Sequence, residues 1–268
     1  MSKGKFASRL NAAGTILYPL AFGVLFYFLL QSGGFQKLLG VDEFVLPRPS
    51  SVNAILSGSL PKILTNVRAT LTASLLGLLL GSLLGFLLAV LAAAFPVWGS
   101  GGLRIVGAFN AVPIVALAPV VTNWTKDTST DASVRSMIAK IIVVMLMCTA
   151  TMSISAYRGL TELRPFSEDL LNSYAASRTT IFKKLRLPNC VPYIFTALQV
   201  SVPLSVISAL VSEYFAEYVI GIGRQIRENI VLAQYTTAWA YITVACILGI
   251  ALYAILMVLK AVALRHRG

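Results

Sequence analysis

The chain has 268 residues, of which 57% are hydrophobic and only 12% are charged, and its mean hydropathy is +0.81. A soluble domain of this length cannot bury so much apolar surface in one core, so the composition excludes an ordinary soluble globular protein. The charged residues gather in short stretches between uncharged runs of roughly 20 residues, the length with which a helix crosses a bilayer. We therefore expect a membrane protein with several spans.

Six apolar runs are long enough to cross the membrane, and they occupy 12–31, 69–95, 105–122, 137–157, 191–212 and 238–259. Only helices and closed barrels satisfy their backbone groups in lipid, and these runs lack the period-two alternation of barrel strands. The first run follows a basic start and has no small-residue cleavage site, so it is predicted to be an uncleaved anchor. The predicted fold class is an all-α polytopic membrane protein with about six transmembrane helices, in a single domain over residues 1–268.

The distribution of charge predicts the topology. If the N-terminus is cytoplasmic, more than half of the 22 Lys and Arg residues fall in cytoplasmic segments, whereas most of the ten carboxylates fall outside. Basic residues beside spans favour the cytoplasmic side, so we expect both termini in the cytoplasm. The net charge of +12 would also suit nucleic acid. Attraction to membrane lipid already explains basic residues next to spans, so no nucleic-acid partner is expected.

The longest segment that this topology places in the cytoplasm is 158–190. Ser167 is predicted to cap a helix there, with Pro188 as its stop. The charge order suits the helix dipole, because Glu168 and Asp169 come first and the basic residues come last, namely Lys183, Lys184 and Arg186. Small residues in the middle favour a helix that inserts into a groove of a partner protein. The alternative is an amphipathic helix lying on lipid headgroups.

The sequence of this loop resembles a known motif. DLLNSYAASR at 169–178, followed by Phe182, Leu187–Pro188 and Pro192, resembles the EAA loop of ABC importer permeases. The usual pattern there is E-A-A-x-x-x-G-A-S with a downstream L-P, so Asp169 stands at the glutamate position and Ala175 at the glycine position. FVLPRPSSVNAIL at 44–56 and AVPIVALAP at 111–119 are similar to segments of the sulfonate, nitrate and thiamine-precursor branch.

The resemblance implies a type I ABC importer permease bundle with a cytoplasmic coupling helix. It makes 1–43 an anchor helix and outer loop, 44–260 the core permease and 158–190 the coupling loop. It also implies a homodimer in the bacterial plasma (inner) membrane, two ABC ATPase subunits and an extracytoplasmic substrate-binding protein. The residues implied to couple to the ATPase are Asp169, Tyr174, Ala175, Ala176, Ser177, Arg178 and Lys183.

The chain itself has no G-x-x-x-x-G-K-[ST] loop to hold ATP phosphates. We therefore expect a non-catalytic subunit that binds no cofactor, with ATP and Mg²⁺ used by the partner ATPase. Within the branch, the resemblance implies a pyrimidine thiamine precursor, riboflavin or a related heterocycle as solute. A permease for a sulfonate, nitrate or similar small anion is the alternative. A secondary transporter is a weaker one, because internal repeats and ionisable residues at the membrane midplane are not evident.

Candidate residues of the translocation pathway are Asn110, Pro113, Trp124, Glu213 and Tyr214. A carboxylate at membrane depth is costly, so Glu213 is predicted to close a gate, bridge to the second subunit or contact the binding protein; an interfacial position in water is the alternative. In the second run, Gly77, Gly81 and Gly85 follow one another at four-residue spacing. This pattern predicts close helix packing, either within one subunit or at a dimer interface.

Overall fold

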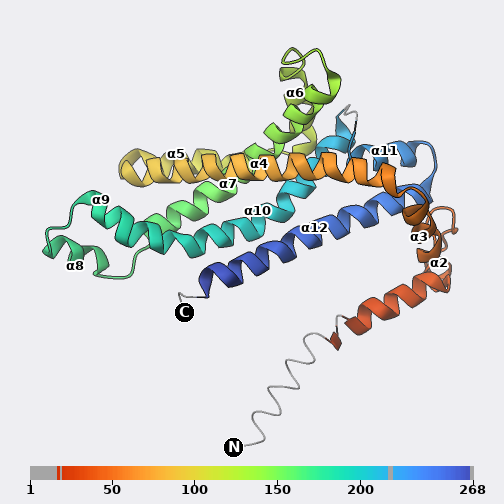
Figure 1. Cartoon of the computed structure of the whole chain (residues 1–268), viewed down its shortest axis with the longest axis horizontal. Helices are drawn as coiled ribbons and strands as arrows, with labels where there is room; N and C mark the ends of the chain where they lie inside the picture. The colour runs from red at the N-terminus through yellow and green to blue at the C-terminus, as the bar shows by residue number, and fades with distance from the viewer. Residues whose placement is uncertain (1–16, 19, 217–219, 266–268) are drawn as a thin grey trace, which may run out of the picture. The chain divides into compact units, whose positions relative to one another are not determined.

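The computed structural model describes residues 17–18, 20–216 and 220–265, which form two compact units (Figure 1). One unit consists of residues 1–60 and 228–240, and the other of 61–227 and 241–268. All regular structure among the described residues is helical. The predicted all-α class is therefore confirmed.

The smaller unit contains the helix Leu20–Gln31, α2 (Gly34–Leu39) and α3 (Pro49–Gly58). The predicted first span at 12–31 begins outside the described residues, and this helix covers its second part. Pro49 stands at the start of α3, where its missing N–H has no helical partner to lose. The Gln31 side chain accepts from Ser50 N–H at 3.1 Å, and Trp239 Nε1 donates to Val45 O at 3.0 Å. These bonds fix the proline-rich segment before α3.

Within the part of the chain that the structure describes, four helices are long and apolar enough to cross a bilayer. They are α4 (Leu60–Ala94), α7 (Ala132–Thr161), the continuous helix Arg178–Phe215, and α12 (Tyr235–Leu264). They contain the fourth, fifth and sixth predicted runs and all but the last residue of the second, and each begins before the predicted run. The α7 helix begins at Ala132 because the Asp131 side chain accepts from Ser133 N–H at 2.8 Å and so caps it.

The third predicted run, 105–122, is not one helix, and that part of the prediction was wrong. α5 (Pro96–Ala108) ends inside it, a short turn follows as η1 (Phe109–Ala111), and α6 (Ile114–Trp124) begins after Pro113. Pro113 cannot donate a backbone hydrogen bond and it disfavours helical geometry in the residue before it, so the chain breaks there.

Pro188 does not stop the helix, so this prediction was also wrong. α9 (Arg178–Ile181), the wide π-helical turn η2 (Phe182–Arg186) and α10 (Leu187–Phe215) run on as one helix. A π-turn locally changes the hydrogen-bond pattern, which accommodates a proline that would otherwise clash with the carbonyl four residues earlier. Pro192 and Pro203 also lie inside α10.

The larger unit is built on the close approach of α4 to α7. A Cβ added to Gly77 would lie 2.5 Å from Val144 Cβ, and one added to Gly81 would lie 2.5 Å from the Met145 carbonyl oxygen. At Gly85 the same test gives 2.5 Å to the Thr149 carbonyl oxygen. These distances are too short for any real side chain, so the glycine stripe lies directly on α7 of the same chain.

The other face of this contact continues into α10 through small buried residues. Alanine, serine and cysteine side chains leave room for the helices to approach, and larger ones fill the gaps. The buried clusters that join these helices are Ala89, Met152, Ala156, Leu160, Cys190 and Ala197 in one group and Val144, Cys148 and Ala209 in another. The three helices thus form one packed layer.

We predict that Gly81→Ala lowers the thermal stability of the purified protein, by about 1–3 kcal/mol, because the new methyl group overpacks the contact with α7. Gly249→Ala in α12 is the matched control, since no described atom beyond its own stretch of helix lies within 4 Å of the position of its Cβ. There the better helix propensity of alanine should leave stability unchanged or raise it by up to about 1 kcal/mol. Equal effects of the two substitutions in a detergent melting experiment would contradict this packing.

Candidate functional site

The coupling loop folds into one short helix, a tight turn and the start of the continuous helix Arg178–Phe215. α8 (Ser167–Ser173) ends in two backbone hydrogen bonds, from Ala175 N–H to Asn172 O at 2.9 Å and from Ala176 N–H to Leu171 O at 3.1 Å. This pair is the Schellman arrangement that terminates a helix. The single helix predicted from Ser167 to Pro188 was therefore wrong.

The continuous helix begins with α9, at the end of the motif. Ser177 is its N-cap, and its Oγ accepts from Thr180 N–H at 3.3 Å. The predicted cap Ser167 is instead the first residue of α8, which follows Phe166 without a side-chain cap. Glu168 and Asp169 do lie in the first turn of α8, where the helix dipole favours negative charge.

Ala175 has a φ of +53°, in the left-handed region. It is the residue that follows the C-cap of a Schellman motif, the position that glycine most often fills. A Cβ in this conformation costs roughly 1–2 kcal/mol, because it crowds the following carbonyl oxygen. The structure therefore gives a physical reason why the motif that this loop resembles has glycine at the position of Ala175.

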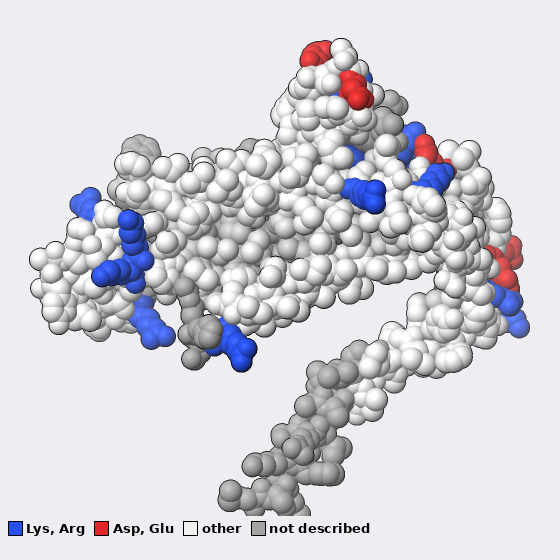
Figure 2. Space-filling model, in the orientation of Figure 1, with Lys and Arg blue, Asp and Glu red and all other residues white. Residues whose placement is uncertain are grey.

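The tip of the coupling loop is exposed and partly apolar. Phe166, Leu170 and Tyr174 are spaced four residues apart, and 81%, 59% and 78% of their surfaces are exposed. Among the other predicted coupling residues, Ala176 is half-buried, and the exposed ones are Asp169, Ala175, Ser177, Arg178 and Lys183. Figure 2 shows basic side chains around α9 and beside α8, next to the uncharged surface over the end of α4 and over α10. The loop thus presents an exposed apolar strip with basic side chains around it.

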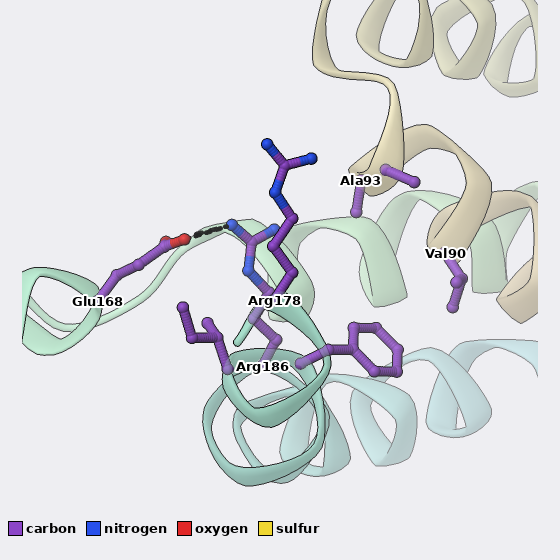
Figure 3. A pocket seen from close by; sticks show the side chains of 8 residues that line it. Val90, Ala93, Glu168, Arg178 and Arg186 are labelled. Carbon is purple, nitrogen blue, oxygen red and sulfur yellow. Dashed lines mark hydrogen bonds and ion pairs between the residues drawn. The ribbon is translucent and has the colours of Figure 1, made fainter. Parts of the chain in front are cut away.

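Behind the tip lies a cavity of about 470 Å³, between the end of α4 and the α8–α9 segment (Figure 3). Arg186 donates to both carboxylate oxygens of Glu168, at 2.9 and 3.1 Å. Both side chains are partly exposed, so this ion pair contributes about 1 kcal/mol at most. Its main effect is positional, because it ties α8 to the helix that continues into α10. The cavity is lined by Val90, Ala93, Ala94, Glu168, Arg178, Ile181, Phe182 and Arg186.

A buried polar cluster lies at the opposite end of α10. Glu213 is fully buried, and its carboxylate accepts from Lys140 Nζ on α7 at 3.1 Å. Thr70 Oγ1 on α4 lies 2.9 and 3.0 Å from the two carboxylate oxygens. Lys140 is 1% exposed and also donates to the Ile220 carbonyl at 2.9 Å. Such pairing and hydrogen bonding is what keeps a buried charge tolerable.

The same cluster holds the start of α11 (Ile222–Val231). Gly221 N–H donates to Asn66 Oδ1 at 2.9 Å, Ile222 N–H to Thr70 Oγ1 at 3.0 Å, and Gly223 N–H to Glu213 Oε2 at 2.9 Å. The first N–H groups of a helix have no partner within it, so side chains of α4 and α10 cap α11 from outside. A Cβ on Gly221 would lie 2.2 Å from Glu213 Cδ, which leaves room only for glycine.

Of this cluster, only Glu213 was predicted as a candidate. Asn66, Thr70, Gly221 and Gly223 carry no signal in the sequence alone. Lys140 does carry one, because it is the only charged residue in the run 137–157 before Arg158, and an isolated charge in a span normally has a partner. The buried position of Glu213 excludes the alternative of a carboxylate in interfacial water.

The structure places the remaining pathway candidates in different surroundings. Asn110 and Pro113 line a cavity of about 440 Å³ beside α7 and α10, together with Ala111, Val112, Ile114, Met147, Thr151, Val200 and Leu204. Glu213 does not line this cavity. Tyr214 packs its ring on Phe215 at a centroid distance of 4.9 Å, and Trp124 at the end of α6 is 67% exposed. The structure thus brings together only two of the five predicted residues.

We predict that Ala175→Gly stabilises the turn of the coupling loop by about 1 kcal/mol, because glycine removes the left-handed strain. The peptide bond after Arg178 should then be cut by trypsin about fivefold more slowly, since cleavage follows the population of the open loop. Ala175→Val should be cut faster. Ala176→Gly is the control, and a slower cut in that variant as well would argue against strain at position 175.

The comparisons with known proteins agree with this architecture. Residues 81–266 match the family described as the binding-protein-dependent transport system inner membrane component. The formylaminopyrimidine transport permease protein ThiX of Halalkalibacterium halodurans is 28% identical over 160 residues, and the match spans 60% of this chain and 60% of the relative.

A solved structure of the MetNI methionine ABC transporter in inward-facing conformations matches with a TM-score of 0.52 and 15% identity. The match covers 74% of this chain and 94% of the matched chain, and at this identity it concerns the fold alone. The family match covers more than half of the chain. The chain therefore belongs to the inner membrane components of binding-protein-dependent transport systems and is a permease subunit of an ABC importer.

Proposed function

We propose that this permease imports a small heterocycle of the pyrimidine thiamine-precursor kind, delivered by an extracytoplasmic binding protein. The observation that carries the proposal is the cavity beside Asn110 and Pro113, where none of the described lining residues is charged. Its volume of about 440 Å³ lies in the range of small-molecule sites. The name of the ThiX relative, a formylaminopyrimidine transport permease, supports the same class of solute.

The lining of the cavity supports one of the two solute classes that the sequence leaves open. A nitrate or sulfonate that loses its water needs a cation or several hydrogen-bond donors in return. This cavity offers the Asn110 amide and the Thr151 hydroxyl among apolar walls. Two such polar groups suit the ring nitrogens and amino groups of a heterocycle. Riboflavin and related compounds belong to the same class, and the small anion is the second candidate.

The coupling loop serves in this proposal as the docking surface for the ATPase. We place it and both termini in the cytoplasm, in a homodimer that binds two ATPase subunits. The exposed strip of Phe166, Leu170 and Tyr174 supplies apolar anchors, and Arg178 and Lys183 pair with acidic residues of the ATPase. ATP and Mg²⁺ are bound by that partner, and the surrounding lipid covers the apolar spans.

We predict that Tyr174→Ala weakens binding of the ATPase by about tenfold to a hundredfold, as expected for an aromatic anchor at the centre of an interface. Ala176→Trp should abolish co-purification with the ATPase, because the large ring replaces a small residue beside the turn. Leu232→Ala is the matched control, since Leu232 is 65% exposed but lies outside the coupling loop. Full co-purification of both loop variants would place the ATPase on another surface.

Uptake into proteoliposomes tests the transport proposal. Permease, ATPase and binding protein together should accumulate labelled formylaminopyrimidine only when ATP is enclosed with the ATPase. Asn110→Leu should reduce this uptake about tenfold or more, because it replaces a hydrogen-bonding group in the cavity with an apolar one. Competition by nitrate or an alkyl sulfonate instead of the pyrimidine would favour the second solute class. Uptake driven by a proton gradient without ATP would contradict the importer.

A further inference from the structure

The cluster of Asn66, Thr70, Lys140 and Glu213, called here the α11 anchor, consists entirely of buried polar and charged side chains. Its four side chains come from three long helices, and three of them, Asn66, Thr70 and Glu213, accept from consecutive backbone N–H groups, those of Gly221, Ile222 and Gly223. Lys140 adds a fourth link, to the Ile220 carbonyl just before them. Both charged members are almost completely buried.

We propose that Glu213 and Lys140 are positioning residues of the transport cycle, which keep the first turn of α11 fixed to α4, α7 and α10 while the transporter changes state. The part of this inference that concerns transport rests on the proposed function. With the coupling loop in the cytoplasm, the opposite end of α10 faces outward, so the anchor fixes a surface on the side from which the binding protein delivers solute.

Electrostatics explains why the anchor holds. Removing either charge leaves the other one buried without its partner, which is strongly unfavourable. Moving the 220–223 segment away would break the Lys140 bond to Ile220 O and three bonds from backbone N–H groups at once. These hydrogen bonds hold one short segment, so they must all break together before the segment can move away. The anchor therefore favours a rigid connection over a gate that opens at this point.

An apolar contact at this place would lack hydrogen-bond acceptors for the backbone of α11. Buried ion pairs can often be replaced by apolar residues without loss of stability, so stability alone does not require this pair. Apolar side chains, however, cannot accept hydrogen bonds from the N–H groups at the start of α11. The oxygens of Asn66, Thr70 and Glu213 accept them, and Lys140 neutralises the carboxylate that does so.

Hydrogen–deuterium exchange of the full-length permease in nanodiscs tests the anchor without any solute. In the natural chain, the amides of residues 221–223 should be protected. The double variant Glu213→Gln/Lys140→Met removes both charges together and leaves no buried charge unpaired. We expect about tenfold faster exchange of a peptide covering 220–227, the effect of losing roughly one net hydrogen bond, with unchanged exchange of the α10 segment 196–209.

Thr70→Val is a second, nearly isosteric variant that removes the acceptor of Ile222 N–H, and it should accelerate exchange of the same peptide. Ser208→Ala is the matched control, because Ser208 is fully buried on α10 and its hydroxyl has no hydrogen-bond partner. Unchanged exchange at 220–227 in both anchor variants would overturn the proposal. Faster exchange throughout α10 in both would also overturn it, because the cluster would then serve the fold as a whole.

The role in transport is tested on the assembled transporter, with the ATPase bound, in the absence of nucleotide and with ATP and vanadate. We expect residues 221–223 to stay protected in both conditions, with exchange rates that agree within about threefold, which is below the effect of one net hydrogen bond. Loss of protection in one condition would show that the segment opens as a gate, and the proposal would be wrong. Failure of the permease to bind the ATPase would refute the proposed function, whereas the measurements on the permease alone would still decide the anchor.

Discussion

The structure depends on the direct contact between the backbones of α4 and α7. In lipid there is no water to drive apolar helices together, so close packing and internal hydrogen bonds must hold them. Gly77, Gly81 and Gly85 remove the side chains that would keep the helices apart. Thr70, seven residues before the stripe, then comes within hydrogen-bond distance of Glu213 on α10. Val90 and Ala93, after the stripe, reach the cavity behind the coupling loop. The same contact therefore positions both ends of the packed layer.

Two sites of opposite character result from this arrangement. The coupling loop is exposed and basic, and its one short helix is followed by a strained turn at Ala175. The α11 anchor is buried. Lys140 and Glu213 form an ion pair there, and the Glu213 carboxylate also accepts from the Gly223 N–H group. A partner protein can bind to the first site, whereas the second has no accessible surface to offer. In the function we propose, the exposed end contacts the ATPase, and the buried end holds α11 to the same helices, so that both ends move together.

The sequence was informative wherever composition and local motifs decide the structure. Long apolar runs predicted the helical membrane class, and the resemblance of the D-L-L-N-S-Y-A-A-S-R segment predicted the family that the chain matches. The coupling role of this loop stays a prediction. The turn inside this loop was missed. A glycine would have indicated its left-handed residue, but this chain has Ala175 there, and alanine does not by itself indicate a left-handed conformation. The continuity through Pro188 was missed because it depends on the π-turn before it, which no single residue announces.

The α11 anchor could not be predicted for a different reason. Asn66 lies 155 positions before Gly221, from whose N–H it accepts, and hydroxyl and amide side chains are common in any helix. Only three-dimensional packing brings Asn66, Thr70 and Lys140 to the backbone of Gly221–Gly223. The isolated charge of Lys140 was a real indication, but finding its partner required the register of α7 against α10, which follows from the small residues between them.

The central claim is that close packing makes α4, α7 and α10 one rigid body that carries both the coupling loop and the anchor. Its most direct test is the distance between spin labels at positions 170 and 220, placed in one permease subunit of the assembled transporter after replacement of the exposed Cys246. A rigid body predicts the same distance distribution without nucleotide and with ATP and vanadate. A shift of about 5 Å or more, comparable to the one-turn displacement of a helix, would contradict it.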